Sequence, residues 1–415
     1  MSKVSKKVIF LLVYCLVFAT FFKIPAFASV KKAESSGYFY GQDGKKKTEQ
    51  WVDRKYYVDK NGERLKNTWA KLIPAPGDTK TPNKSDRFWY FFNNKGERLE
   101  NTEKYIGSAK YYLGAEGRML TGWVGNRYYG GEDDGALKIG WFKINQSWRY
   151  FTEDRGNLWT PASVPSNVEG VTKIIGGKTY AFNASGEMLF GWVKINNQYA
   201  SRSIENYAYF GSANDGSMKT NTWKYLTLSK NILNDDQYYW FYFKDNGQVQ
   251  NSSTESEKKF VSIKGAEYLF DIYGRVCHGL QWIGDELYYL GSKDQCWVQK
   301  DVYIASLKEA DGLGTFYFQA DGRGLTGVRA GDDSLYYKGK LQKASAKEVF
   351  RVVSFVQNGV HQNYVVDSMG KIQRNATVSN GEGSVYQTNS SGTLLLVDRE
   401  TPHEGVGFEP QRANP

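Results

Sequence analysis

Short aromatic segments alternate with polar turns along most of the chain. Segments such as residues 55–58 and 87–92 are rich in Tyr, Phe and Trp, which favour β-strands. The polar stretches that follow, for example 59–62 (DKNG) and 244–247 (KDNG), end in glycine. Asp and Asn favour tight turns because they bond to the nearby backbone, and the closing glycine accepts a positive φ. Each unit therefore predicts a β-hairpin.

The unit recurs from Tyr38 almost to Leu396, often with a Met or Leu after the glycine and then a tryptophan. A hairpin of this size is not stable alone in water, so neighbouring hairpins must stack and share an aromatic core. Apart from a turn or two of helix near residues 344–350, the sequence predicts an all-β fold, a solenoid of stacked β-hairpin repeats. The turn glycines of these units are Gly62, Gly96, Gly117, Gly135, Gly156, Gly186, Gly216, Gly247, Gly274, Gly322, Gly370 and Gly392.

The repeats divide the chain into blocks. We expect N-terminal hairpin repeats at 29–70, a proline-containing loop at 71–86, central repeats at 87–324 and degenerate repeats at 325–400, followed by a tail at 401–415. A second proline-containing stretch, at 158–177, is also predicted to be a surface loop.

The first 28 residues have the pattern of a secretory signal peptide. Basic residues precede an apolar run at 8–22, and 26–28 (AFA) supplies the small-x-small pattern of a cleavage site. The apolar run is short for a membrane anchor, so we expect cleavage after Ala28 and no transmembrane segment afterwards. Residues 401–415 contain neither a second apolar run nor a sorting motif. We therefore expect a secreted protein that is held at the cell surface non-covalently.

The positive charge is modest and spread along the chain. The formal net charge is +10, and removal of the four lysines in 1–28 lowers it by four, to +6. The basic residues form no dense stripe, which argues against nucleic acid as a partner. An ordinary solvated surface explains the excess, which also suits an anionic cell-wall polymer such as teichoic acid.

Cys277 and Cys296 are the only cysteines after position 28, and nineteen residues separate them. This spacing is near one repeat length, so the alternatives are a disulfide between neighbouring hairpins or two free thiols. The three histidines are dispersed, and together with one cysteine pair they predict no metal site and no cofactor.

The repeats resemble the cell-wall-binding repeat family, which includes choline-binding modules, glucan-binding repeats and the repeats of clostridial toxins. The resemblance is carried by 121–124 (TGWV), 139–145 (IGWFKIN) with Trp148, and 190–197 (FGWVKINN). It covers most of the chain after residue 37 and is weak after Leu325. Only three Gly-Trp dipeptides occur, whereas Trp69 and Trp223 follow threonine, which implies that many units have lost a ligand site.

In the choline-binding branch, a cage of rings between consecutive hairpins holds a quaternary ammonium group. Electron-rich ring faces attract such a cation by about 1–2 kcal/mol for each desolvated contact. The resemblance implies a cage at Trp141 and Trp148, completed by the preceding unit; packing between hairpins is the alternative role of each ring. The residues assigned to ligand binding in this way are Trp123, Tyr128, Trp141, Trp148, Trp192 and Met119.

Other binding roles fit the same composition. Aromatic rings also stack on sugars, and Asn145 and Gln146 could supply hydrogen bonds beside them. The partner is then a cell-wall polymer, either choline-decorated teichoic acid or glycan, or else a host glycoconjugate. A further alternative is an adhesin or interaction scaffold that binds partner proteins without a small ligand.

We expect no enzymatic activity. The repeats start within about ten residues of the predicted cleavage site, and the sequence contains no nucleophile elbow, HExxH pair or phosphate loop. Acidic pairs such as Asp133-Asp134 occur in turns, where solvated carboxylates are common. No catalytic residue is therefore predicted.

Overall fold

The computed structural model describes residues 37–78, 86–255, 258–309, 312–357, 359–381, 383–398 and 403–404. Within these ranges the chain forms β-strands, loops and one short 3-10 helix, η1 (Ile204–Asn206), which confirms the predicted all-β class. The predicted signal peptide and most of the tail lie outside the described residues. The described part contains no helix long and apolar enough to span a membrane. The chain divides into two compact units, Met1–Trp159 and Thr160–Pro415.

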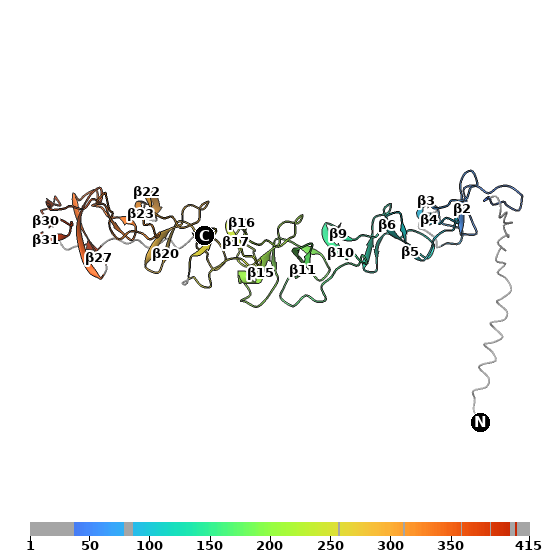
Figure 1. Ribbon diagram of the computed structural model, residues 1–415, viewed down its shortest axis with the longest axis horizontal. Coiled ribbons are helices and arrows are strands. Elements are labelled where there is room, and N and C mark those ends of the chain that lie inside the picture. Colours follow the sequence, from blue (N-terminus) through green and yellow to red (C-terminus); the bar gives the residue numbers. More distant parts are fainter. Residues whose placement is uncertain are drawn as a thin grey trace, which may run out of the picture. The chain divides into compact units, whose positions relative to one another are not determined.

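Unit 1 consists of antiparallel hairpins that follow one another in sequence order (Figure 1). The loop predicted at 71–86 needs a correction, because Lys71 and Leu72 belong to a strand and Lys71 pairs with Trp89. The described prolines, Pro74 and Pro76, therefore lie between the two strands of one hairpin and not between blocks of repeats. The strands, paired two by two, are β1 (Gln50–Val52), β2 (Tyr56–Val58), β3 (Thr68–Leu72), β4 (Phe88–Phe92), β5 (Thr102–Ile106), β6 (Ala109–Leu113), β7 (Gly122–Val124), β8 (Arg127–Tyr129), β9 (Gly140–Ile144) and β10 (Ser147–Phe151).

The first part of unit 2 continues the same pattern of small antiparallel sheets. The second predicted loop, 158–177, is shorter than expected, since a strand starts at Val171. The strands are β11 (Val171–Ile175), β12 (Lys178–Phe182), β13 (Met188–Leu189), β14 (Trp192–Lys194), β15 (Tyr207–Tyr209), β16 (Thr222–Thr227), β17 (Tyr238–Phe243), β18 (Val261–Ile263), β19 (Ala266–Tyr268), β20 (Leu280–Ile283) and β21 (Glu286–Tyr289).

The last part of unit 2 has longer strands and larger sheets, one with the order β22-β23-β26-β25-β24 and one with β28-β27-β32. The turn of helix expected near 344–350 is absent from this described stretch, which is a loop leading into β27. The strands are β22 (Val302–Glu309), β23 (Gly312–Phe318), β24 (Gly327–Val328), β25 (Leu335–Tyr337), β26 (Lys340–Leu341), β27 (Phe350–Gln357), β28 (Val360–Asp367), β29 (Thr377–Ser379), β30 (Val385–Thr388), β31 (Leu394–Asp398) and β32 (His403–Glu404).

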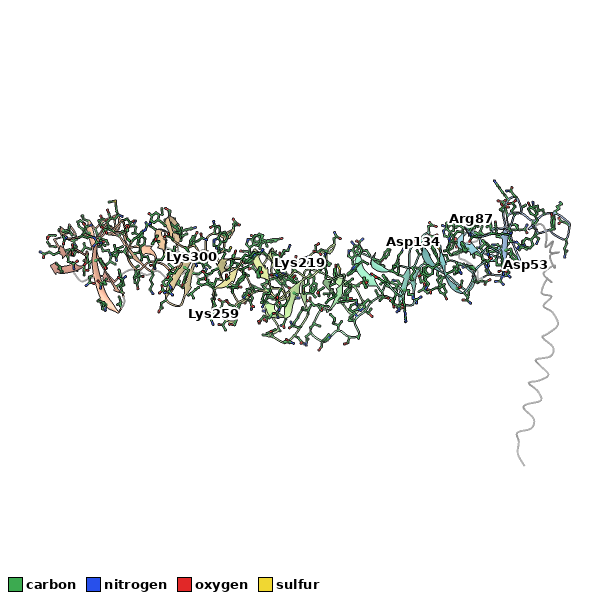
Figure 2. All side chains as sticks on the ribbon, in the orientation of Figure 1. Asp53, Arg87, Asp134, Lys219, Lys259 and Lys300 are labelled. Atoms are coloured by element: carbon green, nitrogen blue, oxygen red, sulfur yellow. The ribbon has the colours of Figure 1, made fainter. Side chains whose placement is uncertain are left out.

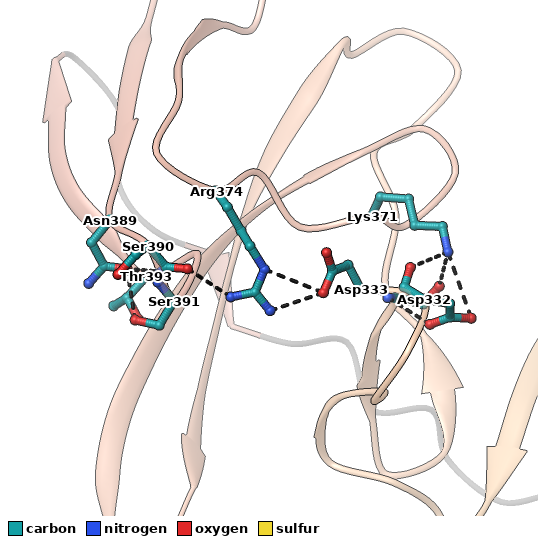
Figure 3. A network of polar contacts seen from close by, with 9 residues as sticks. Asp332, Asp333, Lys371, Arg374, Asn389, Ser390, Ser391 and Thr393 are labelled. Carbon is teal, nitrogen blue, oxygen red and sulfur yellow. Dashed lines mark hydrogen bonds and ion pairs between the residues drawn. The ribbon is translucent and has the colours of Figure 1, made fainter.

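Polar contacts connect the turns of this last part (Figure 3). Arg374 donates to the Asp333 carboxylate at 3.0 Å and to the carbonyl of Ser390 at 2.9 Å. Lys371 reaches the turn of Asp332 as well and donates to Ser334 Oγ at 2.9 Å. The degenerate repeats are thus held together by side chains that bridge one turn to the next.

Acidic residues also brace turns elsewhere in the chain. Lys219, labelled in Figure 2, pairs with Asp215 four residues earlier, and a hydrogen bond from Lys219 is the main cause that lowers the pKa of Asp215 to about 2. Asp133 accepts hydrogen bonds from Lys71 at 2.7 Å and from the indole N–H of Trp89 at 2.8 Å. Both carboxylates lie in turns, and each has a structural partner; the partners of Asp133 belong to β3 and β4.

A repeated backbone contact joins many hairpins to the previous one within each unit. The residue two positions after a turn glycine donates its N–H to a strand carbonyl of the preceding hairpin, as Met119 does to Trp89 at 2.8 Å and Met218 does to Thr179 at 2.8 Å. Because buried backbone groups need partners, these bonds fix the register between neighbouring hairpins.

The side chain of the same residue packs against the turn glycine of the next hairpin, a contact that we call the turn joint. A Cβ at Gly135 would lie 2.3 Å from Sδ of Met119, and one at Gly247 would lie 2.6 Å from Sδ of Met218. Both glycines also have a positive φ, a backbone conformation that other residues adopt less readily. Equivalent joints are Arg64 on Gly96, Arg98 on Gly117, Leu137 on Gly156, Met188 on Gly216, Val249 on Gly274, Val298 on Gly322 and Ile372 on Gly392.

Both cysteines are free and buried, so the disulfide alternative is not realised. Cys277 packs with Leu269 and Leu290, whereas Cys296 packs with Ile263 and Phe270 in a different core cluster. Burial raises the pKa of Cys277 to about 12 and is the main cause that raises that of Cys296 to about 11. Both are therefore protonated thiols at neutral pH.

Candidate functional site

The hairpin β16–β17 presents a row of aromatic side chains on each of its faces. Successive residues of a strand point to opposite faces, so Tyr239, Phe241 and Phe243 of β17 enter the core, where each is buried. The intervening Trp240 and Tyr242 lie on the other face. There they pair with residues of β16.

The register of the hairpin brings four rings onto that second face. Trp223 pairs with Tyr242 and Tyr225 pairs with Trp240 across the two strands. The ring centroids of Trp223 and Tyr242 are 5.0 Å apart, and those of Tyr225 and Trp240 are 5.2 Å apart. Trp223, Trp240 and Tyr242 are partly buried, because they pack against a core cluster of the following hairpins that includes Phe270, Val276 and Cys296. The part of this face that the cluster leaves open is a candidate for ligand binding.

A cavity of about 200 Å³ lies over Trp223 and Trp240, and we call it the aromatic pocket. Tyr268 of β19 forms a second wall, with its ring centroid 4.8 Å from that of Trp223. Trp297, about one-third exposed, closes the rim from the turn after β21. Three successive hairpins thus build one site. Its described lining residues are Trp223, Trp240, Tyr268, Asp294, Gln295, Cys296 and Trp297.

The electrostatics of the aromatic pocket favour a cation. Asp294 is the only charged residue among the described lining residues, and no lysine or arginine is among them. Burial raises the pKa of Tyr268, so its ring remains neutral at physiological pH. Several electron-rich rings beside one carboxylate attract a positive charge, and the ring faces suit methyl groups better than they suit a hydrated ion.

The turn that carries Trp297 departs from its equivalents in one informative way. Cys296 N donates to Ser292 O at 3.0 Å, just as Gly216 N donates to Ser212 O at 2.8 Å in an earlier unit. Cys296 therefore stands at a glycine position, and it keeps the positive φ of 56°. Its side chain adds a thiol to the pocket floor, where Sγ donates to Lys293 O at 2.9 Å.

The structure brings together only part of the ligand cage that the resemblance implies. Trp123 and Tyr128 are paired, with ring centroids 5.2 Å apart, and Trp123 also contacts Phe151 at 5.8 Å. Successive residues of a strand point to opposite faces of the hairpin β9–β10. Phe151 and Phe142 point to one face, and Trp141 and Trp148 point to the other. The two tryptophan groups therefore do not line one common cage.

Met119 and Trp192 have clear packing roles. Met119 forms the turn joint on Gly135. Trp192 belongs to unit 2, donates its indole N–H to Thr227 O at 2.9 Å and contacts the rings of Phe241 and Phe243 at 5.3 and 5.7 Å. That any of the six assigned residues binds a ligand stays a prediction.

Most of the aromatic pocket was missed by the sequence analysis. Trp223 follows threonine and so departs from the Gly-Trp pattern, and Trp240 is one of six consecutive aromatic residues. Trp297 lies in a turn, at a position occupied by Ser217 in the equivalent turn. Alignment of the units on their turns would have identified Trp297 as an extra ring. The described residues contain no cluster of His, Cys, Asp and Glu suited to a metal ion.

No model of a known protein family matches the sequence, and no curated protein matches it. The chain is similar to choline-binding proteins. Choline binding protein F from Streptococcus pneumoniae is 21% identical, with 69% of this chain and 95% of that chain covered and a TM-score of 0.43.

Two further solved structures have comparable similarity. CbpJ from Streptococcus pneumoniae TIGR4 is 18% identical over 72% of this chain and 100% of its own, with a TM-score of 0.45. The choline-binding domain of CbpL from the same species is 22% identical over 58% of this chain and 97% of its own, with a TM-score of 0.31.

Proposed function

We propose that this protein binds quaternary ammonium groups, such as the choline substituents of a cell-wall teichoic acid, in the aromatic pocket. In this role it is a secreted, non-catalytic protein attached non-covalently to the bacterial surface. The observation that supports the proposal is the convergence of Trp223, Trp240, Tyr268 and Trp297 beside Asp294. The names of the similar solved structures agree with this choice.

The physical basis is cation–π attraction in a small enclosure. A trimethylammonium group is only weakly hydrated, and its methyl groups can contact several ring faces at once. The nearby carboxylate of Asp294 adds long-range attraction, which salt screens. A single such pocket gives modest affinity, and several pockets along one polymer would raise the avidity.

The test is a titration of the purified chain with choline, followed by tryptophan fluorescence or calorimetry. Trp297→Ala should weaken binding about tenfold, equivalent to about 1.4 kcal/mol, because one desolvated ring face is lost. Trp297→Phe, which keeps a ring at the rim, is the matched control and should retain most of the affinity. A neutral isostere of choline, 3,3-dimethylbutan-1-ol, should bind far more weakly. Equal binding of the isostere would show that the pocket does not recognise charge.

Retention on isolated cell wall tests the biological part of the proposal. The chain should bind choline-containing wall and should elute with free choline. Retention that soluble glycan, but not choline, reverses would favour the glycan alternative. Absence of retention on wall and on choline resin would leave the scaffold or adhesin alternative.

A further inference from the structure

A cavity of about 530 Å³ lies in unit 1, and we call it the polar cavity. Alternate residues of a strand share a face, so Glu103 and its cross-strand partner Tyr112 point to one face of the hairpin β5–β6. Val124 and its partner Arg127 share a face of the next hairpin, β7–β8. These two faces line the cavity together with Asn157, from the turn after β10. Its volume is within the range of roughly 300–1,000 Å³ that is usual for small-ligand sites.

The carboxylate in the polar cavity is neutralised by the protein itself. Arg127 Nη1 donates to Oε1 of Glu103 at 2.5 Å, the hydroxyl of Tyr129 donates to the same oxygen, and Lys110 Nζ lies 2.6 Å from Oε2. One carboxylate and two cationic groups leave this cluster with a net charge of +1. The polar cavity therefore favours a ligand with a single negative charge and disfavours a cation.

Several hydrogen-bonding groups of the polar cavity remain available to a ligand. Within the described part of the chain, Arg127 uses Nε toward Oδ1 of Asn157 at 3.1 Å and Nη1 toward Glu103, so the donors on its Nη2 remain. Asn157 keeps the donors on its Nδ2, and the exposed side-chain amide of Asn126 has no partner among the described residues. A guanidinium group beside amide donors is suited to bind a carboxylate.

The remaining lining distinguishes a peptide from an inorganic anion. The side-chain amide of Asn126 both donates and accepts, which matches a peptide group, whereas a phosphodiester offers only acceptors. Val124 and the half-buried ring of Tyr112 add an apolar wall that a small side chain can contact. The single positive charge also matches one carboxylate better than it matches a dianion.

We propose that the polar cavity binds the free carboxyl terminus of a short peptide. The terminal carboxylate accepts hydrogen bonds from Nη2 of Arg127 and Nδ2 of Asn157. Asn126 pairs with the last peptide group, and the last side chain contacts Val124 and Tyr112. This site belongs to unit 1, so it does not depend on what the aromatic pocket of unit 2 binds.

Calorimetric titration of the full chain with acetyl-alanyl-alanine tests this inference. The dipeptide should bind, and the same dipeptide with an amidated carboxyl terminus should bind about tenfold more weakly, because the charge-assisted hydrogen bonds to Arg127 are lost. Acetate and inorganic phosphate are the reference anions, and both should bind more weakly than the dipeptide, since neither has a peptide group for Asn126. Absence of binding, equal binding of the acid and the amide, or phosphate binding as tight as that of the dipeptide would overturn the proposal.

Two substitutions locate the bound dipeptide. Arg127→Lys keeps a positive partner for Glu103 but removes the planar guanidinium, and it should weaken binding about tenfold. Asn126→Ala, at an exposed turn position where the fold tolerates substitution, should weaken binding about threefold through loss of one hydrogen bond. Asn94→Ala is the matched control, because Asn94 is exposed in another turn of unit 1 and should leave the affinity unchanged. Dipeptide binding that survives both cavity substitutions would place the ligand elsewhere and overturn the site.

Discussion

Equivalent sets of aromatic rings in the two units differ in whether an arginine side chain covers them. In unit 1, Trp51 contacts Tyr90 at 5.0 Å and Phe92 at 5.7 Å; in unit 2, Trp223 contacts Tyr268 at 4.8 Å and Phe270 at 6.0 Å. The arrangement of rings is the same, but within the part of the chain that the structure describes an arginine covers only the first set.

Arg98 provides that cover. Its guanidinium carbon lies 5.2 Å from the ring centroid of Trp51 and 5.8 Å from that of Tyr90, and its side chain is almost wholly buried against the Asp78 carboxylate at 2.8 Å. The internal cation satisfies the ring faces that an external one would otherwise use. Other arginines of unit 1 do the same, since Arg64 stacks on Tyr56 and Arg149 on Trp123.

The residue that decides between the two outcomes stands two positions after a turn glycine. Arg98 N donates to Lys55 O at 2.8 Å, and Val276 N donates to Trp240 O at 3.0 Å, so the two residues are equivalent. A long cationic side chain at this position fills the space over the rings, and a short apolar one leaves the aromatic pocket accessible. Whether a set of rings can bind a ligand therefore depends on the residue at this position as well as on the rings themselves.

Removal of the internal cation should have the largest effect. Arg98→Ala leaves the fully buried Asp78 with one partner fewer and exposes two ring faces, which should cost about 3 kcal/mol of unfolding free energy. Urea denaturation measures it. Arg54→Ala is the control, because Arg54 binds the same carboxylate but is half exposed and should cost less than about 1 kcal/mol. An unchanged urea midpoint for Arg98→Ala would contradict the structural role of the internal cation.

Transfer of the arginine to unit 2 should close the aromatic pocket. We expect Val276→Arg together with Cys296→Gly to weaken choline binding about 100-fold, or about 2.7 kcal/mol, since the guanidinium would cover Trp223 and Tyr268. The glycine restores the space that a long side chain needs in a turn joint. Cys296→Gly alone should still bind choline. A folded double variant with unchanged affinity would show that the two positions are not equivalent.

The smallest expected effect concerns acid stability. Burial acts to raise the pKa of Glu103, but hydrogen bonds from Lys110, Tyr129 and Arg127 outweigh it and lower the value from 4.5 to about 2. Because the folded-state pKa is lowered, the carboxylate stabilises the fold above pH 4.5, and this stabilisation is lost as the pH falls through about 2.

Thermal unfolding between pH 5 and about pH 2 measures this contribution. Glu103→Gln should reduce the acid-induced loss of unfolding free energy by on the order of 1 kcal/mol. The effect is small because the network is partly exposed and solvent screens its charges. The control Glu132→Gln, at a side chain 85% exposed, should keep the wild-type slope. If the stability of Glu103→Gln fell with decreasing pH as steeply as that of the wild type, other groups would be responsible for the acid sensitivity.

The hairpins were predictable because their determinants are local. A turn such as 59–62 and the aromatic segments beside it specify one hairpin without reference to the rest of the chain. The aromatic pocket was not predictable in this way. Which rings of Tyr238–Phe243 face the core depends on the register with β16, and whether a tryptophan stays accessible depends on a residue of the next hairpin, Arg98 or Val276.

The cysteines illustrate the same limit. Their spacing of nineteen residues is compatible with neighbouring hairpins, and they do lie in neighbouring hairpins of unit 2. Cys277, however, follows Val276 in an extended segment and so points to the opposite face, where it joins the cluster of Leu269 and Leu290. The two thiols therefore point into different core clusters, which the spacing in the sequence could not reveal.

The turn joint has a consequence for how such a chain can change in length. The joints named above use the same offset of two residues and pack on a glycine of the next turn, and each runs from one hairpin to the next in chain order. A copied unit would therefore bring both halves of the contact with it, and a deleted unit would leave two compatible ends. The number and spacing of binding sites can be altered by duplication or loss of whole units without a new interface having to be invented.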